Sequence, residues 1–266
     1  MSSTFSFSRL GKLITKQFFE NMRLYLFSIL ALLGLLALVF GFWFIGAGPN
    51  YHEAGLYAIF FTGLFITGTI FASISFNALG SKDKGIYWLS VPATHFEKLA
   101  CTILYATIFF TIAYCACFYC IKFIGLSFLD VYMKKHPGLS YTKLTDFDNG
   151  FGGAIKYMIY AFFAIQSLYL LGSVYFRRYS FIVTTVVGAL VIFAFVYILS
   201  LIHDNMFEGL NWNITSVRTY NDNVTNEYKL YAVSPTVVNI LKYALQFAWV
   251  PVFWFVAWFR LKEKEI

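Results

Sequence analysis

The chain alternates long apolar runs with short polar segments, and this pattern predicts membrane-spanning helices. Six runs are long enough to cross about 30 Å of hydrocarbon, which takes roughly 20 helical residues. The six predicted spans are Leu24–Ile45, Gly55–Leu79, Leu99–Ile121, Tyr157–Phe176, Tyr179–Ile202 and Val237–Phe259. The sequence therefore predicts an all-α, polytopic membrane protein with a single transmembrane domain over residues 1–266. Little more than Arg177 and Arg178 separates the fourth and fifth spans, which predicts a tight helical hairpin.

Residues 5–23, before the first span, follow a different pattern. At 100° per residue, the charged side chains fall in one stripe and leucines, phenylalanines and other apolar residues fall beside it. The stripe consists of Arg9, Lys12, Lys16, Glu20 and Arg23. This pattern predicts an amphipathic helix that lies in the membrane interface. A positively charged anchor without further function is the alternative interpretation.

Composition supports a membrane protein. Hydrophobic residues make up 59% of the chain and charged residues only 12%, about half the charged fraction of a soluble domain. The net charge of +7 comes from basic residues that flank the apolar runs, which is typical of membrane orientation signals rather than of a nucleic-acid surface. The six spans place these basic residues on two sides of the membrane, and the side where they are denser is predicted to be cytoplasmic. Both ends of the chain lie on that side, so both termini are predicted to be cytoplasmic. Two external segments, 122–156 and 203–236, follow from this topology.

The middle of each predicted span lacks Asp, Glu, Lys, Arg and His; Gln166 and Gln246 are the most polar side chains at depth. Ion- and proton-coupled transporters usually need titratable groups there. The chain also contains no Walker-type phosphate loop. The cysteines are interpreted as packing residues, since no histidine or acidic residue nearby completes a zinc site. They are Cys101, Cys115, Cys117 and Cys120. We therefore expect no catalytic, cofactor or metal site, and any transport would take its energy from another chain.

The segment 80–98, between the second and third spans, is the strongest candidate for a functional surface. Thr94 and Glu97 have the spacing of a capping box for the third span, and Pro92 ends whatever precedes it. Upstream, charged residues stand beside Tyr87, Trp88 and Leu89 in a turn or short helix. Aromatic side chains beside charges suit a contact with a protein partner. An interfacial aromatic belt explains them equally well.

This layout resembles the membrane (permease) subunit of type-2 ABC exporters. Three strings are similar to a bacterial branch of that family common in Bacteroidetes: WLSVPATHFEKL at 88–99, FRRYSFIVT at 176–184 and WFRLKEKEI at 258–266. The family's LPAS-x-x-EK pattern departs here to Val91-Pro-Ala-Thr94, which keeps the capping chemistry. The resemblance covers the whole chain in layout, and only the short strings are specific.

The resemblance implies a multi-pass permease of the bacterial inner membrane that works as a homodimer or with a related permease. Each copy would pair with a cytoplasmic ABC ATPase that holds ATP and magnesium, so this chain would not itself be an enzyme. Segment 80–98 would seat in a groove of the ATPase, and the charged stripe of 5–23 would contribute. The implied coupling residues are Lys82, Asp83, Lys84, Tyr87, Trp88, Leu89, Pro92, Thr94 and Glu97. The aromatic, uncharged spans favour a lipid-like cargo over an ion.

Two other functions explain the same sequence. A membrane scaffold that recruits a cytoplasmic partner through segment 80–98, without transport, also needs no titratable group at depth. An intramembrane enzyme acting on lipids is the third interpretation, because acidic residues and a histidine in the external segments are available. These residues are Asp146, Asp148, His203, Asp204 and Glu208.

Overall fold

The computed structural model of the chain describes residues 5–77, 85–87, 90–144, 151–176, 178–206, 211–213, 216–220, 228–232 and 234–263. Helices dominate these residues, and five helices among them are long and apolar enough to cross a membrane. They are Phe7–Gly46, Glu53–Ile74, His95–Lys135, Ala154–Tyr175 and Ser180–Ile198. Helices of this length and composition indicate a membrane protein.

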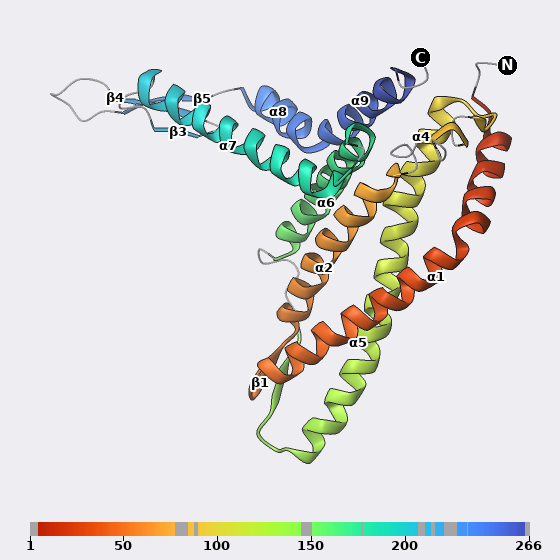
Figure 1. Cartoon of the computed structure of the whole chain (residues 1–266). Helices are drawn as coiled ribbons and strands as arrows, with labels where there is room; N and C mark the ends of the chain where they lie inside the picture. The colour runs from red at the N-terminus through yellow and green to blue at the C-terminus, as the bar shows by residue number, and fades with distance from the viewer. Residues whose placement is uncertain are drawn as a thin grey trace.

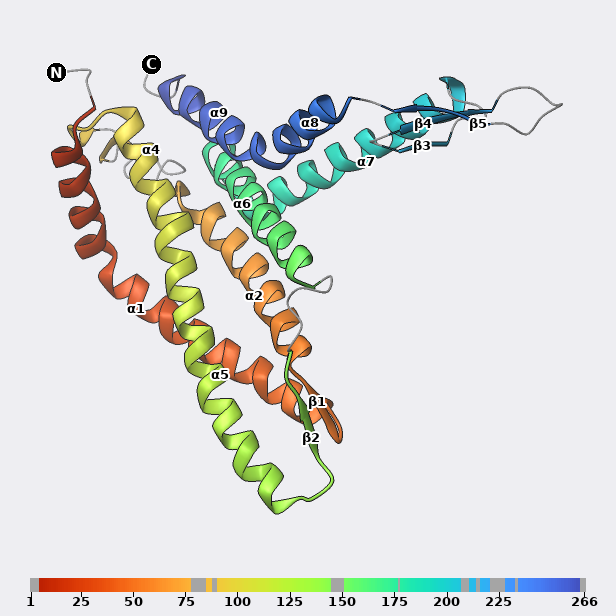
Figure 2. The ribbon, with the colours of Figure 1, turned by 180° about the vertical axis from the view of Figure 1, so that it is seen from behind.

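Helix α1, Phe7–Gly46, joins the predicted interface helix and the first predicted span into one element of 40 residues. The sequence has no proline or glycine between Gly11 and Gly34, so nothing breaks the helix where the charged stripe gives way to the apolar run. The helix continues through this region but bends, and the remainder of α1 runs at an angle to its N-terminal part (Figures 1 and 2). The two predicted elements are therefore one bent helix.

The third predicted span belongs to a helix that is much longer than expected. Helix α4 (His95–Ile103), the π-helix η2 (Leu104–Phe109) and helix α5 (Phe110–Lys135) follow one another without a gap over 41 residues. The predicted span ended at Ile121, so the external segment that was expected to begin at residue 122 begins as helix. This long helix packs against α1 along the bundle (Figure 1).

Helix α2 (Glu53–Ile74) packs on helix α6 (Phe151–Tyr175), and the buried side chains form two apolar clusters. One cluster gathers around Phe76, Leu99 and Leu170, toward the end of the bundle that holds the termini. The other gathers around Leu64, Tyr114 and Phe162. Gly68 allows α2 and α6 to approach closely, because a Cβ atom at this position would lie 2.8 Å from the ring of Phe162.

At the end of the bundle opposite the termini, two short strands and an ion pair connect neighbouring segments. Strand β1 (Asn50–His52) pairs in parallel with strand β2 (Ser140–Thr142). Glu53 accepts a hydrogen bond from Lys122 Nζ at 2.6 Å and another from the Leu144 N–H at 2.9 Å. Burial alone would raise the pKa of Glu53, but these donors lower it. The start of α2 is thereby tied to α5 and to the segment that follows β2.

The sixth predicted span is not one helix. Helix α8 (Pro235–Phe247) and helix α9 (Trp249–Glu263) replace it, and they meet at Ala248. Pro251 explains the break, because it has no N–H to donate to the carbonyl of Phe247 and its ring clashes with that carbonyl. Neither helix alone is as long as a membrane span. Helix α9 packs on α6 and ends on the same side of the bundle as the start of α1 (Figures 1 and 2).

The predicted tight hairpin of the fourth and fifth spans is also wrong over most of its length. Helix α7 (Ser180–Met206) contacts α6 near the turn and then leads away from the bundle (Figures 1 and 2). Its outer part is exposed on every side, with Phe193 75% and Phe195 61% exposed. An antiparallel sheet lies beside its far end, made of β3 (Asn211–Asn213), β4 (Ser216–Tyr220) and β5 (Tyr228–Ala232).

Candidate functional site

The capping box predicted from the sequence is confirmed. Glu97 N donates to Thr94 Oγ1 at 3.2 Å, and Thr94 N donates to Glu97 Oε2 at 2.9 Å, so each residue satisfies a free donor of the other. Upstream, the Ala93 N–H donates to the Val91 carbonyl at 2.8 Å and makes a tight turn around the exposed Pro92. The helix that runs the length of the bundle therefore begins at a sharply defined residue.

Glu97 also binds the beginning of α1. Its Oε1 atom accepts hydrogen bonds from Ser6 N at 2.7 Å, from Arg9 Nη2 at 2.9 Å and from Arg9 Nε at 3.2 Å. The Glu97 side chain is fully buried, whereas that of Arg9 is 33% exposed. We call this set of Ser6, Arg9, Thr94 and Glu97 the carboxylate clamp. It joins α1 to α4, two elements that are nearly 90 residues apart in sequence.

The clamp keeps Glu97 ionised. Burial alone would raise the pKa of Glu97, but the hydrogen bond from Arg9, the backbone N–H groups of Thr94 and Ser6 and the charge of Arg9 lower it to about 2. The carboxylate precedes the apolar stretch that begins at Leu99, so it lies at the end of the bundle and outside the predicted hydrocarbon region.

A pH series tests this charge. A carboxyl with a lowered pKa stabilises the fold fully above its ordinary value of 4.5, and this contribution is lost as the pH falls toward about 2. The difference in unfolding temperature between the natural protein and Glu97→Gln should therefore shrink as the pH is lowered from about 5 to about 2, and stay constant between about pH 6 and 8. A difference that persists at the lowest pH would show that shape, rather than charge, accounts for the effect of Glu97.

A second polar contact joins α1 to residues 85–87. Tyr87 donates its hydroxyl to Glu20 Oε1 at 2.8 Å, and Lys16 Nζ lies 3.7 Å from the same oxygen. Lys16 Nζ also lies 4.8 Å from the centre of the Tyr87 ring. The hydrogen bond with Tyr87 and the charge of Glu20 raise the pKa of Lys16. Three residues predicted from two separate stretches of the sequence therefore meet.

The remaining predicted residues divide into three groups. Lys12 and Arg23 are exposed on α1 and extend the charged surface beside the clamp. Lys82, Asp83, Lys84, Trp88 and Leu89 lie outside the described residues, as do Arg177, Asp146, Asp148 and Glu208. For His203 and Asp204 the structure describes only the helix that contains them, α7. In the described part of the chain, no three His, Cys, Asp or Glu residues gather as a metal site would require.

The sequence did not predict several further residues that join α1 to α4 and η2. Cys101 Sγ donates to Gln17 Oε1 at 3.2 Å, and Tyr105 donates its hydroxyl to the Ile14 carbonyl at 2.8 Å. The rings of Tyr25 and Tyr105 stack with their centres 5.6 Å apart. The amphipathic pattern predicts that the apolar flank of this helix faces lipid, and nothing in the sequence indicated that Gln17 and Ile14 would contact α4 and η2.

Comparisons with known proteins found no relative of the chain. No protein-family model matches the chain, and neither the curated proteins nor the solved structures gave a match.

Proposed function

We propose that the chain is the permease subunit of an ATP-driven exporter in the bacterial inner membrane. A separate cytoplasmic ATPase would bind ATP and magnesium and dock on the surface formed by the start of α1 and residues 85–87 and 90–97. The permease would work as a homodimer or with a related permease. The proposal rests on the resemblance in sequence and on the physical arrangement of this surface.

The carboxylate clamp is the observation that carries the proposal. A docking surface that transmits movement must be stiff and must be connected to the helices that move. Glu97 is buried, bonded by four donors and located in the first turn of the 41-residue helix that reaches the opposite end of the bundle. A push on residues 90–97 would therefore shift α1 and this helix together.

The exposed part of the surface suits a protein partner. Tyr87 is 56% exposed and stands beside Lys16 and Glu20, while Lys12 adds a further exposed charge. Tyrosine is enriched at protein interfaces, and polar residues commonly form the rim around such an anchor. A scaffold without transport would use the same surface, so the experiments must separate recruitment from coupling.

The first experiment purifies the tagged protein from its native membranes in mild detergent and identifies its partners. A P-loop ATPase is expected to copurify with the natural protein. Tyr87→Ala should reduce its recovery by about tenfold, because removing an aromatic anchor commonly costs more than 1.4 kcal/mol of binding energy. Tyr157→Ala is the matched control: Tyr157 is 59% exposed at the start of α6, and its loss should leave recovery unchanged.

Absence of any ATPase from the natural protein, or equal recovery with all three proteins, would contradict the proposal. Reconstitution then separates the permease from the scaffold. In liposomes, a permease should stimulate hydrolysis of ATP by the copurified ATPase, and a scaffold that only recruits the ATPase should leave its rate unchanged.

A further inference from the structure

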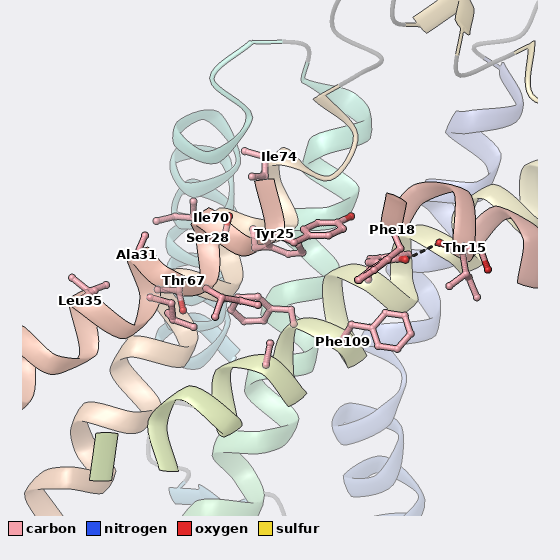
Figure 3. A pocket seen from close by; sticks show the side chains of 17 residues that line it. Thr15, Phe18, Tyr25, Ser28, Ala31, Leu35, Thr67, Ile70, Ile74 and Phe109 are labelled. Carbon is pink, nitrogen blue, oxygen red and sulfur yellow. Dashed lines mark hydrogen bonds between the residues drawn. The ribbon is translucent and has the colours of Figure 1, made fainter. Parts of the chain in front are cut away.

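Two hollows adjoin in the wall of the bundle beneath the candidate docking surface. The first has a volume of about 700 Å³ and is lined by apolar side chains of α1 and α2 and by residues of η2 and α5. Figure 3 shows several of these side chains, among them Ala31 and Leu35 of α1, Ile70 of α2 and Phe109 of η2. The volume falls within the roughly 300–1,000 Å³ typical of ligand sites.

The second hollow, of about 450 Å³, has a polar lining. Lys16, Gln17, Glu20 and Asn21 of α1 line it together with Asn77. Four residues line both hollows, and they are Tyr25, Phe71, Ile74 and Tyr105. The two hollows therefore adjoin, and together they offer an apolar part and a polar part side by side.

The polarity of this site follows that of a membrane leaflet. On α1, the polar hollow spans positions from Leu13 to Tyr25, within and just after the charged stripe. The apolar hollow begins at the same level, at Ile14 and Thr15, but it extends along the same helix to Leu35, well inside the predicted hydrocarbon region. Charged groups thus lie at the level expected for lipid headgroups, and apolar groups lie at the level of the chains.

The apolar hollow also opens sideways. Ile70 is 43% exposed, Ile74 48% and Phe109 43%, so none of the residues that the structure describes closes the wall on this side. The π-helix contributes Tyr105 and Phe109 to the lining. Its wider turn changes the direction of side chains along the long helix, and such turns are frequent at functional sites.

We propose that the joined hollows bind one amphiphilic molecule, a membrane lipid or a molecule of similar build. Its apolar chain lies between Ala31, Ile70 and Phe109, and its polar headgroup lies among Lys16, Gln17 and Asn21. The molecule enters sideways from the leaflet on the side of the termini. The binding site itself does not depend on the proposed function. The further step, that the bound molecule is the exported cargo, rests on the proposed function.

The test uses a phosphatidylethanolamine with a photoreactive diazirine near the end of one acyl chain. The probe is incorporated into proteoliposomes of the full-length protein without an ATPase, and labelled peptides are identified by mass spectrometry. We expect labelling to concentrate on the peptides around Ala31 and Ile70. Ala31→Trp, which places a large side chain in part of the apolar hollow, should reduce this labelling by about tenfold, because displacing two buried methylene groups weakens binding by about that factor.

Ala189→Trp is the matched control, since it adds the same volume to an exposed position on α7. It should leave labelling around Ala31 and Ile70 unchanged. Equal labelling in all three proteins would show that the probe reports only the surrounding lipid, and this result would overturn the proposal. Crosslinks between two copies of the chain at Ile70 or Ile74, with no lipid adduct there, would also overturn it, because a second copy would then fill the site.

The result is independent of the ATPase experiment. Lipid labelling without a copurifying ATPase would keep the binding site and remove its role in ATP-driven export. A copurifying ATPase without lipid labelling would keep the proposed function and remove this assignment of its cargo.

Discussion

Replacing Glu97 with alanine is expected to lower the free energy of unfolding by about 3 kcal/mol. The substitution removes the buried carboxylate that accepts from the N–H groups of Ser6 and Thr94 and from the guanidinium of Arg9. It also removes half of the capping box that starts α4. Thermal unfolding in detergent, followed by loss of the monodisperse peak in size-exclusion chromatography, measures the effect.

Glu263→Ala is the control for this prediction. It also breaks an Arg–Glu contact, between Arg260 and Glu263 at 2.7 Å, but the Glu263 side chain is 62% exposed. Exposed pairs contribute about 0–1 kcal/mol, so this variant should unfold close to the natural protein. If both variants lost the same stability, burial of Glu97 would not be the reason for its importance, and the clamp would not be the rigid connection proposed here.

Gly172→Ala is expected to cost about 2 kcal/mol and to separate α7 from α6. A Cβ atom on Gly172 would overlap Thr184 Oγ1 and would lie 2.9 Å from Thr184 Cβ. Rotation of the Thr184 side chain moves the hydroxyl but not the Cβ atom, so the backbone of α7 must shift. Thermal unfolding gives the loss of stability, and spin labels on α6 and α7 near the turn give the change in distance.

Gly188→Ala, on α7, tests whether any added methyl group has this effect. The nearest atom to its Cβ would be Leu168 Cδ2 at 3.7 Å, which is an ordinary contact. Alanine also favours helix over glycine, so stability should change by less than about 1 kcal/mol and in the favourable direction. A Gly172→Ala protein as stable as the natural one would mean that α7 is not packed on α6 as described.

Local features of this fold could be predicted from the sequence. The apolar runs identify the helices, because a stretch such as Leu24–Ile45 can satisfy its backbone in hydrocarbon only as a helix. The spacing of Thr94 and Glu97 gave the capping box correctly. The same local reasoning failed where two signals met: the charged stripe and the apolar run of α1 suggested two elements, although no residue between them ends a helix.

Other features depend on contacts between distant residues. The break at Ala248 had a local signal in Pro251, which the apolar pattern outweighed. The direction of α7 and the extension of α5 to Lys135 had no comparable signal, because they depend on packing and on the Glu53–Lys122 pair. In the candidate site, periodicity placed Arg9 and Glu20 on one face of α1 but did not reveal that Glu97 and Tyr87 would be their partners.

The clamp also bears on the order in which the protein is assembled. Arg9 and Glu97 are 88 residues apart, and at roughly 5–20 residues per second the ribosome needs about 5–20 s to produce the second after the first. Two helices long enough to cross a membrane, α1 and α2, lie between them. If both helices cross the membrane, Arg9 and Glu97 lie on the same side, since two crossings return the chain to the side it left; a single crossing would separate them. Formation of the ion pair would thus distinguish a nascent chain with both helices inserted from one with only one of them inserted.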